Sequence, residues 1–260
     1  MGPSSRTLCP PSQDCLLGTM AVIPRNASTV ILLRSRDTLE VLMLRRHSSS
    51  AFLPGAYVFP GGAVEVTDYE SGVEELCSGL GFSEAQRVIS GVKPPELSLG
   101  FFVAAIREAF EEAGILLAYD IQEERLLSRK KLGTEMAAVR QEVYRDPRAF
   151  SLMIREAGMR LATDRLFYFA HWITPEISPI RFDARFFLAE APEDQEVLHD
   201  ALETTEAMWR SPPELLRDHV EKKLYLPVPT LACVEELAGY RTVEEAIAST
   251  RGKDILVCQG

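Results

Sequence analysis

The segment 99–113, LGFFVAAIREAFEEA, constrains the fold of this chain more strongly than any other stretch. Its apolar residues recur at the three- and four-residue spacing of one helical face: Phe102, Ala105, Ile106, Ala109 and Ala113. Gly114 follows at the position where helices commonly end, because glycine adopts a left-handed backbone without steric cost. Since this face is small and apolar, the sequence predicts a helix that presses closely against a sheet.

Strands that could form this sheet are predicted on both sides of the helix. Residues 27–35 and 37–46 are short, apolar segments separated by a polar turn, which predicts a hairpin. Residues 164–175 and 181–191 are rich in aromatic side chains and predict two further strands, and residues 204–211 predict another. Helical patterns follow toward the C-terminus, so we expect an α/β fold with a mixed sheet between helices.

The organisation along the chain indicates one domain over residues 26–260. Residues 1–25 lack periodicity and are expected to be a disordered leader, within which Met20 is a second candidate start. Charged, helix-prone segments at about 69–98 and 122–161 interrupt the strand pattern. We expect them to be helical insertions that cover a cleft, form a homodimer interface, or do both.

Charge and cysteine content exclude several classes of protein. The formal net charge of −10 argues against a general binder of nucleic acid or of anionic membranes. The five cysteines are an odd number without a CxxC motif, which predicts reduced thiols. No apolar run approaches the ~18 residues of a membrane span. Together with the missing secretory pattern, these features predict a cytoplasmic protein.

The helix at 99–113 also carries a concentration of acidic residues. Glu108, Glu111 and Glu112 stand at i, i+3 and i+4, so their carboxylates share one face, and Arg107 lies four residues before Glu111. Such closely spaced carboxylates repel one another unless a cation neutralises them, and an oxygen-rich site suits Mg²⁺ or Mn²⁺. The alternative is an ordinary amphipathic helix with a solvated acidic face.

A glycine turn upstream and the order of residues in the helix distinguish these alternatives. The motif FPGG follows a short predicted strand, and REAFEEAGI reads Arg-Glu-apolar-x-Glu-Glu-x-Gly-apolar. This combination resembles the Nudix box, whose first half would begin at Gly62 and place Asp68 where the family usually has glutamate. Between Asp68 and Arg107 lie 38 residues (107 − 68 − 1) instead of seven. An insertion of this kind resembles the Nudix branch that includes the peroxisomal coenzyme A diphosphatases of animals.

The resemblance implies a Nudix α/β/α sandwich and roles for the residues of the box. Glu111 and Glu112 would be the principal ligands of Mg²⁺ or Mn²⁺, and Glu108 a further ligand or the base that orients water. Arg107 would orient this cluster as part of the catalytic site. The carbonyl of Gly62 could complete the metal coordination, and Asp68 would pair with Arg107 across the insertion.

Substrate-binding residues are predicted outside the box. Arg45 and Arg46 end a strand near the glycine turn, and since adjacent strand residues face opposite ways, only one should reach a phosphate. Arg181 and Arg185 are four apart on a predicted strand and would share a face. Beside Asp68, the candidates for an auxiliary acid are Glu203 and Glu206.

The resemblance favours Mg²⁺-dependent hydrolysis of the diphosphate of coenzyme A or acyl-CoA, giving phosphopantetheine or its acylated form and 3′,5′-ADP. An alternative substrate is ADP-ribose, NADH or a related nucleoside diphosphate derivative. An alternative of another class is a Nudix-fold module that senses a nucleotide without cleaving it, although such a module should have lost a metal ligand. The expected partner is therefore a small molecule and neither nucleic acid nor membrane.

Overall fold

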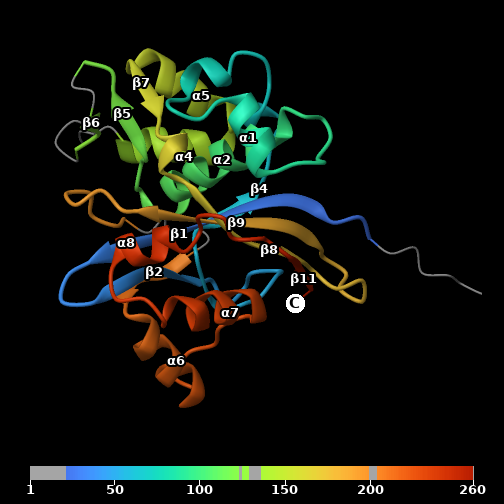
Figure 1. Cartoon of the computed structure of the whole chain (residues 1–260), viewed down its shortest axis with the longest axis vertical. Coiled ribbons are helices and arrows are strands. Elements are labelled where there is room, and N and C mark those ends of the chain that lie inside the picture. The colour runs from blue at the N-terminus through green and yellow to red at the C-terminus, as the bar shows by residue number, and fades with distance from the viewer. Residues whose placement is uncertain (1–21, 123–124, 129–135, 199–203, 260) are drawn as a thin grey trace, which may run out of the picture.

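Two long strands run parallel through the centre of the main sheet, and helices cover both of its faces (Figure 1). The computed structural model describes residues 22–122, 125–128, 136–198 and 204–259. Helices α1 and α2 lie over one face, and helices α6, α7 and α8 lie over the other (Figure 1). This three-layer arrangement confirms the predicted α/β sandwich.

The main sheet has the strand order β10-β2-β1-β9-β8-β11, with β3 paired to β2 and β4 paired to β1. A second sheet has the order β6-β5-β7. The strands are β1 (Arg25–Ser35), β2 (Leu39–Arg46), β3 (Tyr57–Val58), β4 (Gly61–Ala63), β5 (Ala118–Asp120), β6 (Arg125–Leu126), β7 (Met159–Leu161), β8 (Phe167–Ile173), β9 (Phe182–Glu190), β10 (Thr204–Arg210) and β11 (Val257–Gln259).

The helices divide between the two faces of the main sheet. The α-helices are α1 (Phe82–Val88), α2 (Leu97–Glu108), α4 (Met136–Arg145), α5 (Arg148–Glu156), α6 (Pro212–Val220), α7 (Val228–Leu237) and α8 (Val243–Ala248). Shorter helical turns are η1 (Val66–Asp68), η2 (Glu74–Leu76), η3 (Ala109–Ala113) and η4 (Thr163–Arg165). Among helices in the described ranges, none combines the length and the apolar character that crossing a membrane requires.

The central strand β1 is apolar without alternation because both of its faces are covered. Val30 and Leu32 pack into the core beneath α2, whereas Ile31 and Leu33 pack into the core beneath α7. Strand β2 pairs with it antiparallel, with Leu33 opposite Val41, which confirms the predicted hairpin. Sequence pattern thus placed β1 and β2 correctly.

The predicted acidic helix is present and is buried along its whole length. All residues of α2 are buried, and the helix continues into a π-helical turn, η3. Gly114 ends it with φ of 68°, a conformation that favours glycine. The hydroxyl of Ser28 on β1 donates to the Phe101 carbonyl at 2.6 Å, which ties the helix to the sheet.

The two insertions combine helices with short strands. Helix α1 and η2 lie in the first, and α4 and α5 lie in the second. Helices alone were predicted for the second insertion, but its ends form β6 and β7, which pair with the two edges of β5. Pairing there satisfies the backbone groups of β5, which a helix could not do. The Ser78 amide donates to the Leu161 carbonyl at 2.9 Å, so the two insertions also contact each other.

The first strand begins slightly earlier than predicted. Residues 1–21 of the predicted leader lie outside the described residues. Arg25 already belongs to β1, and its amide donates to the Arg181 carbonyl at 2.9 Å. Arg181 in turn donates through Nη1 to the Val22 carbonyl at 2.6 Å, so residues 22–25 join the fold.

Candidate active site

The Arg107 side chain is the centre of the acidic cluster. It is only 2% exposed. Its Nε donates to Asp68 Oδ1 at 2.8 Å, and its Nη2 donates to Asp68 Oδ2 at 2.9 Å and to the Ala63 carbonyl at 2.8 Å. Asp68 itself is 2% exposed and accepts a further bond from the Glu65 amide. Although 38 residues separate them (107 − 68 − 1), Asp68 and Arg107 therefore form the pair that the resemblance implied.

The remaining donor of Arg107 serves two glutamates at once. Nη1 donates to Glu108 Oε1 at 2.7 Å and to Glu111 Oε1 at 2.8 Å. The second contact joins residues four apart, the spacing that brings side chains together on one helical face. Arg107 thus fixes the positions of both carboxylates, and Asp68 fixes the position of Arg107.

Strand β4 brings the two glycines of FPGG against Glu112 and Glu108. The Gly61 amide donates to Glu112 Oε2 at 3.1 Å. A Cβ atom added to Gly62 would lie 2.6 Å from Glu108 Oε1, closer than real Cβ contacts allow. A larger residue at position 62 would therefore push the Glu108 carboxylate away from its place on Arg107.

Positive charge in the cluster falls short of negative charge. Asp68, Glu108, Glu111 and Glu112 contribute four buried carboxylates and Arg107 one guanidinium, an excess of three negative charges if all are ionised (four minus one). Burial raises the pKa of Glu108 to about 8, with Arg107 opposing the shift and Glu111 adding to it. Burial alone would lower the pKa of Arg107, but Glu108 and Asp68 raise it, so Arg107 stays charged.

A divalent cation would fit both the chemistry and the position of these carboxylates. In the part of the chain that the structure describes, no three His, Cys, Asp or Glu side chains already converge on a common point. Glu108 and Glu111 are turned toward Arg107, and Glu112 toward Gly61. Their oxygens are nevertheless the hard ligands that Mg²⁺ prefers, and the excess negative charge is what such an ion would neutralise.

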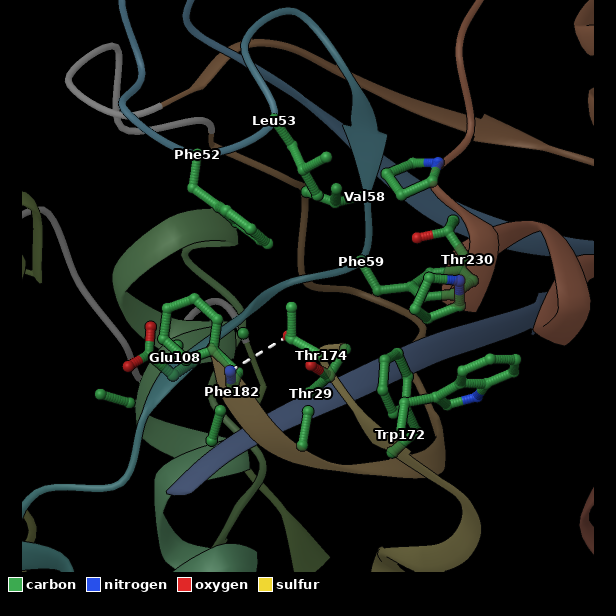
Figure 2. A pocket seen from close by; sticks show the side chains of 18 of the residues that line it. Thr29, Phe52, Leu53, Val58, Phe59, Glu108, Trp172, Thr174, Phe182 and Thr230 are labelled. Atoms are coloured by element: carbon green, nitrogen blue, oxygen red, sulfur yellow. Dashed lines mark hydrogen bonds between the residues drawn. The ribbon is translucent and has the colours of Figure 1, made fainter. Parts of the chain in front are cut away.

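A cavity of about 790 Å³ opens beside this cluster (Figure 2). Its volume lies in the upper part of the range of roughly 300–1,000 Å³ for small-molecule sites. Glu108, Glu111 and Arg107 line it together with Gly61 and Gly62. In Figure 2 Glu108 lies at one side of the cavity, and Trp172 and Thr230 lie at the opposite side. The cavity therefore joins the acidic cluster to the part of the sheet covered by α7.

The structure separates the two neighbouring arginines of β2. Arg46 lines the cavity, and its Nε donates to the Phe52 carbonyl at 3.0 Å. Arg45 does not line it and instead lies over the Tyr57 ring at 5.8 Å. As strand geometry requires, only one of the two faces the cavity, and that one is Arg46.

The two arginines near β9 are committed to structural contacts. Arg181 donates through Nε to the Thr174 carbonyl at 3.0 Å, and Arg185 lies over the Phe101 ring at 4.2 Å. Arg185 also donates to Asp183 Oδ1 at 2.7 Å. Neither arginine lines the cavity, so the prediction that they bind a phosphate gains no support from this geometry.

The candidates for an auxiliary acid also differ in their placement. Asp68 holds Arg107 and lies behind the cluster. Glu206 accepts a hydrogen bond from the Tyr57 hydroxyl at 2.9 Å and lies 3.8 Å from Arg45, away from the cavity lining. Glu203 lies outside the described residues.

Several cavity residues were not predicted from the sequence. They are uncharged and come from separate elements: Thr29, Phe52, Trp172, Phe182, Tyr225 and Thr230. Tyr144 of the second insertion also lines the cavity, as expected if that insertion covers a cleft. No motif links these positions, so their convergence depends on the tertiary structure.

The three-layer fold and the clamped glutamates together define the chain as a member of the Nudix hydrolases. A solved structure of a Nudix hydrolase from Alicyclobacillus acidocaldarius has the same fold, with a TM-score of 0.71 and 24% identity over 88% of this chain and 97% of that chain. The chain belongs to the NUDT19 Nudix domain family, which matches residues 80–237.

Two curated relatives show how far the similarity extends. The acyl-coenzyme A diphosphatase NUDT19 of Xenopus laevis is 29% identical over 235 residues, which cover 79% of this chain and 61% of the relative. The protein of the same name from Homo sapiens is 28% identical over 246 residues, which cover 80% of this chain and 63% of the relative. The chain thus spans about three fifths of the length of these relatives.

Proposed function

We propose that this protein hydrolyses the diphosphate of coenzyme A or acyl-CoA with the help of Mg²⁺, releasing 3′,5′-ADP and phosphopantetheine or its acylated form. The observation that carries the proposal is the Arg107 clamp, which holds Glu108 and Glu111 at the wall of a cavity of about 790 Å³. The names of the relatives, acyl-coenzyme A diphosphatases, support this choice of substrate.

In this proposal the residues of the cluster have separate roles. Glu108, Glu111 and Glu112 would hold Mg²⁺, and the Gly62 carbonyl could serve as a further ligand. The ion, when bound, neutralises diphosphate oxygens and lowers the pKa of water. A carboxylate of the cluster takes the proton from the attacking water, whose oxygen bonds to phosphorus as the P–O bond of the bridging oxygen breaks. Arg107 keeps the carboxylates of Glu108 and Glu111 in position throughout.

Arg46 supplies the cation that a phosphate-rich substrate needs outside the cluster. It lines the cavity, and its Nε is held by the Phe52 carbonyl. Guanidinium groups bind phosphates through paired hydrogen bonds, and Arg46 keeps its terminal nitrogens without a protein partner among the described residues. We assign Arg46 to a substrate phosphate.

Product analysis of the purified protein with Mg²⁺ tests the proposal, with coenzyme A, ADP-ribose and NADH incubated in parallel. We expect 3′,5′-ADP from coenzyme A, and a loss of more than about 100-fold in rate for Glu111→Gln. Glu70→Gln, an exposed carboxylate at the start of the first insertion, is the matched control and should keep the rate. If AMP is released from ADP-ribose or NADH in preference, coenzyme A is the wrong substrate. The proposed mechanism of diphosphate hydrolysis would still stand.

A further inference from the structure

The end of the cavity farthest from Glu108 has a different chemical character. Phe59, Trp172, Pro227 and Val228 line this part, on the face of the sheet that α7 covers. The charged lining residues are Arg25, Arg46, Glu65, Arg107, Glu108 and Glu111, and none of them belongs to β8 or α7. This apolar end, the part of the cavity formed by Phe59, Trp172 and residues 227–230, therefore suits an uncharged group.

Two side chains at its mouth are unusually exposed for their type. Tyr225 is 52% exposed and Val228 is 56% exposed, and both line the cavity. Trp172 is half-buried, and among the described residues no aromatic ring or cation stacks on its indole. Apolar surface left open beside a cavity commonly marks a binding site.

One polar anchor interrupts this apolar surface. Thr230 is 4% exposed, lines the cavity, and has a hydroxyl without a hydrogen-bond partner among the described residues (Figure 2). It lies in the first turn of α7, where the amides of Val228 and Thr230 precede the first intrahelical bonds. No side chain caps this helix end, so hydrogen-bond donors predominate here.

A donor-rich, apolar compartment fits a carbonyl on an apolar chain better than it fits a nucleobase. The exocyclic amino group of adenine needs an acceptor, and among Phe59, Trp172 and residues 227–230 the only side-chain acceptor is the Thr230 hydroxyl. A thioester or amide carbonyl needs only donors, which the Thr230 hydroxyl and the α7 amides can supply. The apolar walls would then bury the attached chain.

We propose that the apolar end is the acyl-arm site of the enzyme, where Thr230 donates to a carbonyl of the acyl-pantetheine arm and Trp172 and Val228 pack against the acyl chain. The inference rests on the proposed function and specifies which part of the substrate this end recognises. The assignment predicts that acyl-CoA is a better substrate than free coenzyme A. Its kcat/KM should be higher by up to about fourfold for each methylene buried, until the compartment is full.

Binding without turnover tests the site independently of catalysis. The chain has two tryptophans, and Trp209 packs on the opposite face of the sheet, so Trp209→Phe leaves Trp172 as the only tryptophan, whose emission can be excited selectively over that of tyrosine. In EDTA, we expect lauroyl-CoA to change Trp172 emission at a lower concentration than coenzyme A, and 3′,5′-ADP to leave it unchanged. Adding Thr230→Val should weaken lauroyl-CoA binding about fivefold, the size of one neutral hydrogen bond.

A response to 3′,5′-ADP equal to that of lauroyl-CoA would overturn the assignment and place the nucleotide on Trp172. No response to lauroyl-CoA would also overturn it.

The kinetic arm compares kcat/KM for lauroyl-CoA and coenzyme A. We expect Val228→Asp to lower this ratio at least tenfold, and Val220→Asp, on an exposed α6 position outside the lining, to leave it unchanged. An unchanged ratio in Val228→Asp, with coenzyme A still cleaved, would refute the assignment of the acyl site and leave the proposed function standing. If neither substrate is cleaved, the proposed function fails, while the fluorescence titration still decides the acyl site.

Discussion

Replacing Asp68 by asparagine removes the charge that holds Arg107 from behind. The wild-type carboxylate accepts from Nε at 2.8 Å and from Nη2 at 2.9 Å, and both side chains are almost fully buried. Asparagine keeps the shape but can accept on one side only, so its amide N–H₂ faces a guanidinium donor. The variant therefore keeps the packing and breaks the charge pair.

The size of the effect follows from what Arg107 retains. Removing one partner of a buried ion pair costs about 3–5 kcal/mol when the other charge is left alone. Here Glu108 and Glu111 still accept from Nη1, and the Ala63 carbonyl still accepts from Nη2. We therefore expect a loss near the size of one charge-assisted hydrogen bond, about 2 kcal/mol. For a chain of this length, that loss lowers Tm by about 4–8 °C.

Urea unfolding at neutral pH measures the change in the free energy of unfolding, and coenzyme A hydrolysis measures the effect on the site. Because Arg107 positions two glutamates, we expect Asp68→Asn also to lower the rate by about 10–100-fold, as for other groups that orient metal ligands. Glu70→Gln, two residues along and exposed, is the control. Wild-type stability together with wild-type rate in Asp68→Asn would refute the argument that this pair organises the cluster.

Three further predictions address other contacts. Gly62→Ala places a methyl group 2.6 Å from Glu108 Oε1, so we expect a loss of activity of at least about tenfold with a folded circular dichroism spectrum; full activity would contradict the close approach. Burial opposes the shift, but a hydrogen-bonded histidine and a neighbouring arginine lower the pKa of Asp183. Its contribution to stability should therefore be present above its unfolded pKa of about 3.9 and disappear as pH falls through the lower folded value. Urea titrations of wild type and Asp183→Asn at pH 7 and at successively lower pH check this, since a difference from wild type that is lost already above a pH of about 3.9 would oppose it. Burial raises the pKa of the Cys77 thiol to about 12, so iodoacetamide at pH 8 should label exposed Cys258 well before Cys77 by peptide mass spectrometry; equal rates would contradict it.

The sequence alone determined the local elements and the chemistry of the helix. Apolar runs and turn residues predicted β1, β2, β8, β9 and β10. The spacing of the glutamates placed their carboxylates on one face, and the order of residues around them identified the Nudix class. These features are local, because helical and strand periodicity depend on neighbours within a few residues of each other.

Tertiary structure decided which side chains meet across long separations in the chain. It closed the Asp68–Arg107 pair over an insertion and turned Arg46 toward the cavity while committing Arg181 and Arg185 elsewhere. It also brought Thr230 to the apolar end of the cavity. Such convergence depends on the packing of β4, β8, β9 and α7 around one cavity, and no pattern within a single segment encodes it.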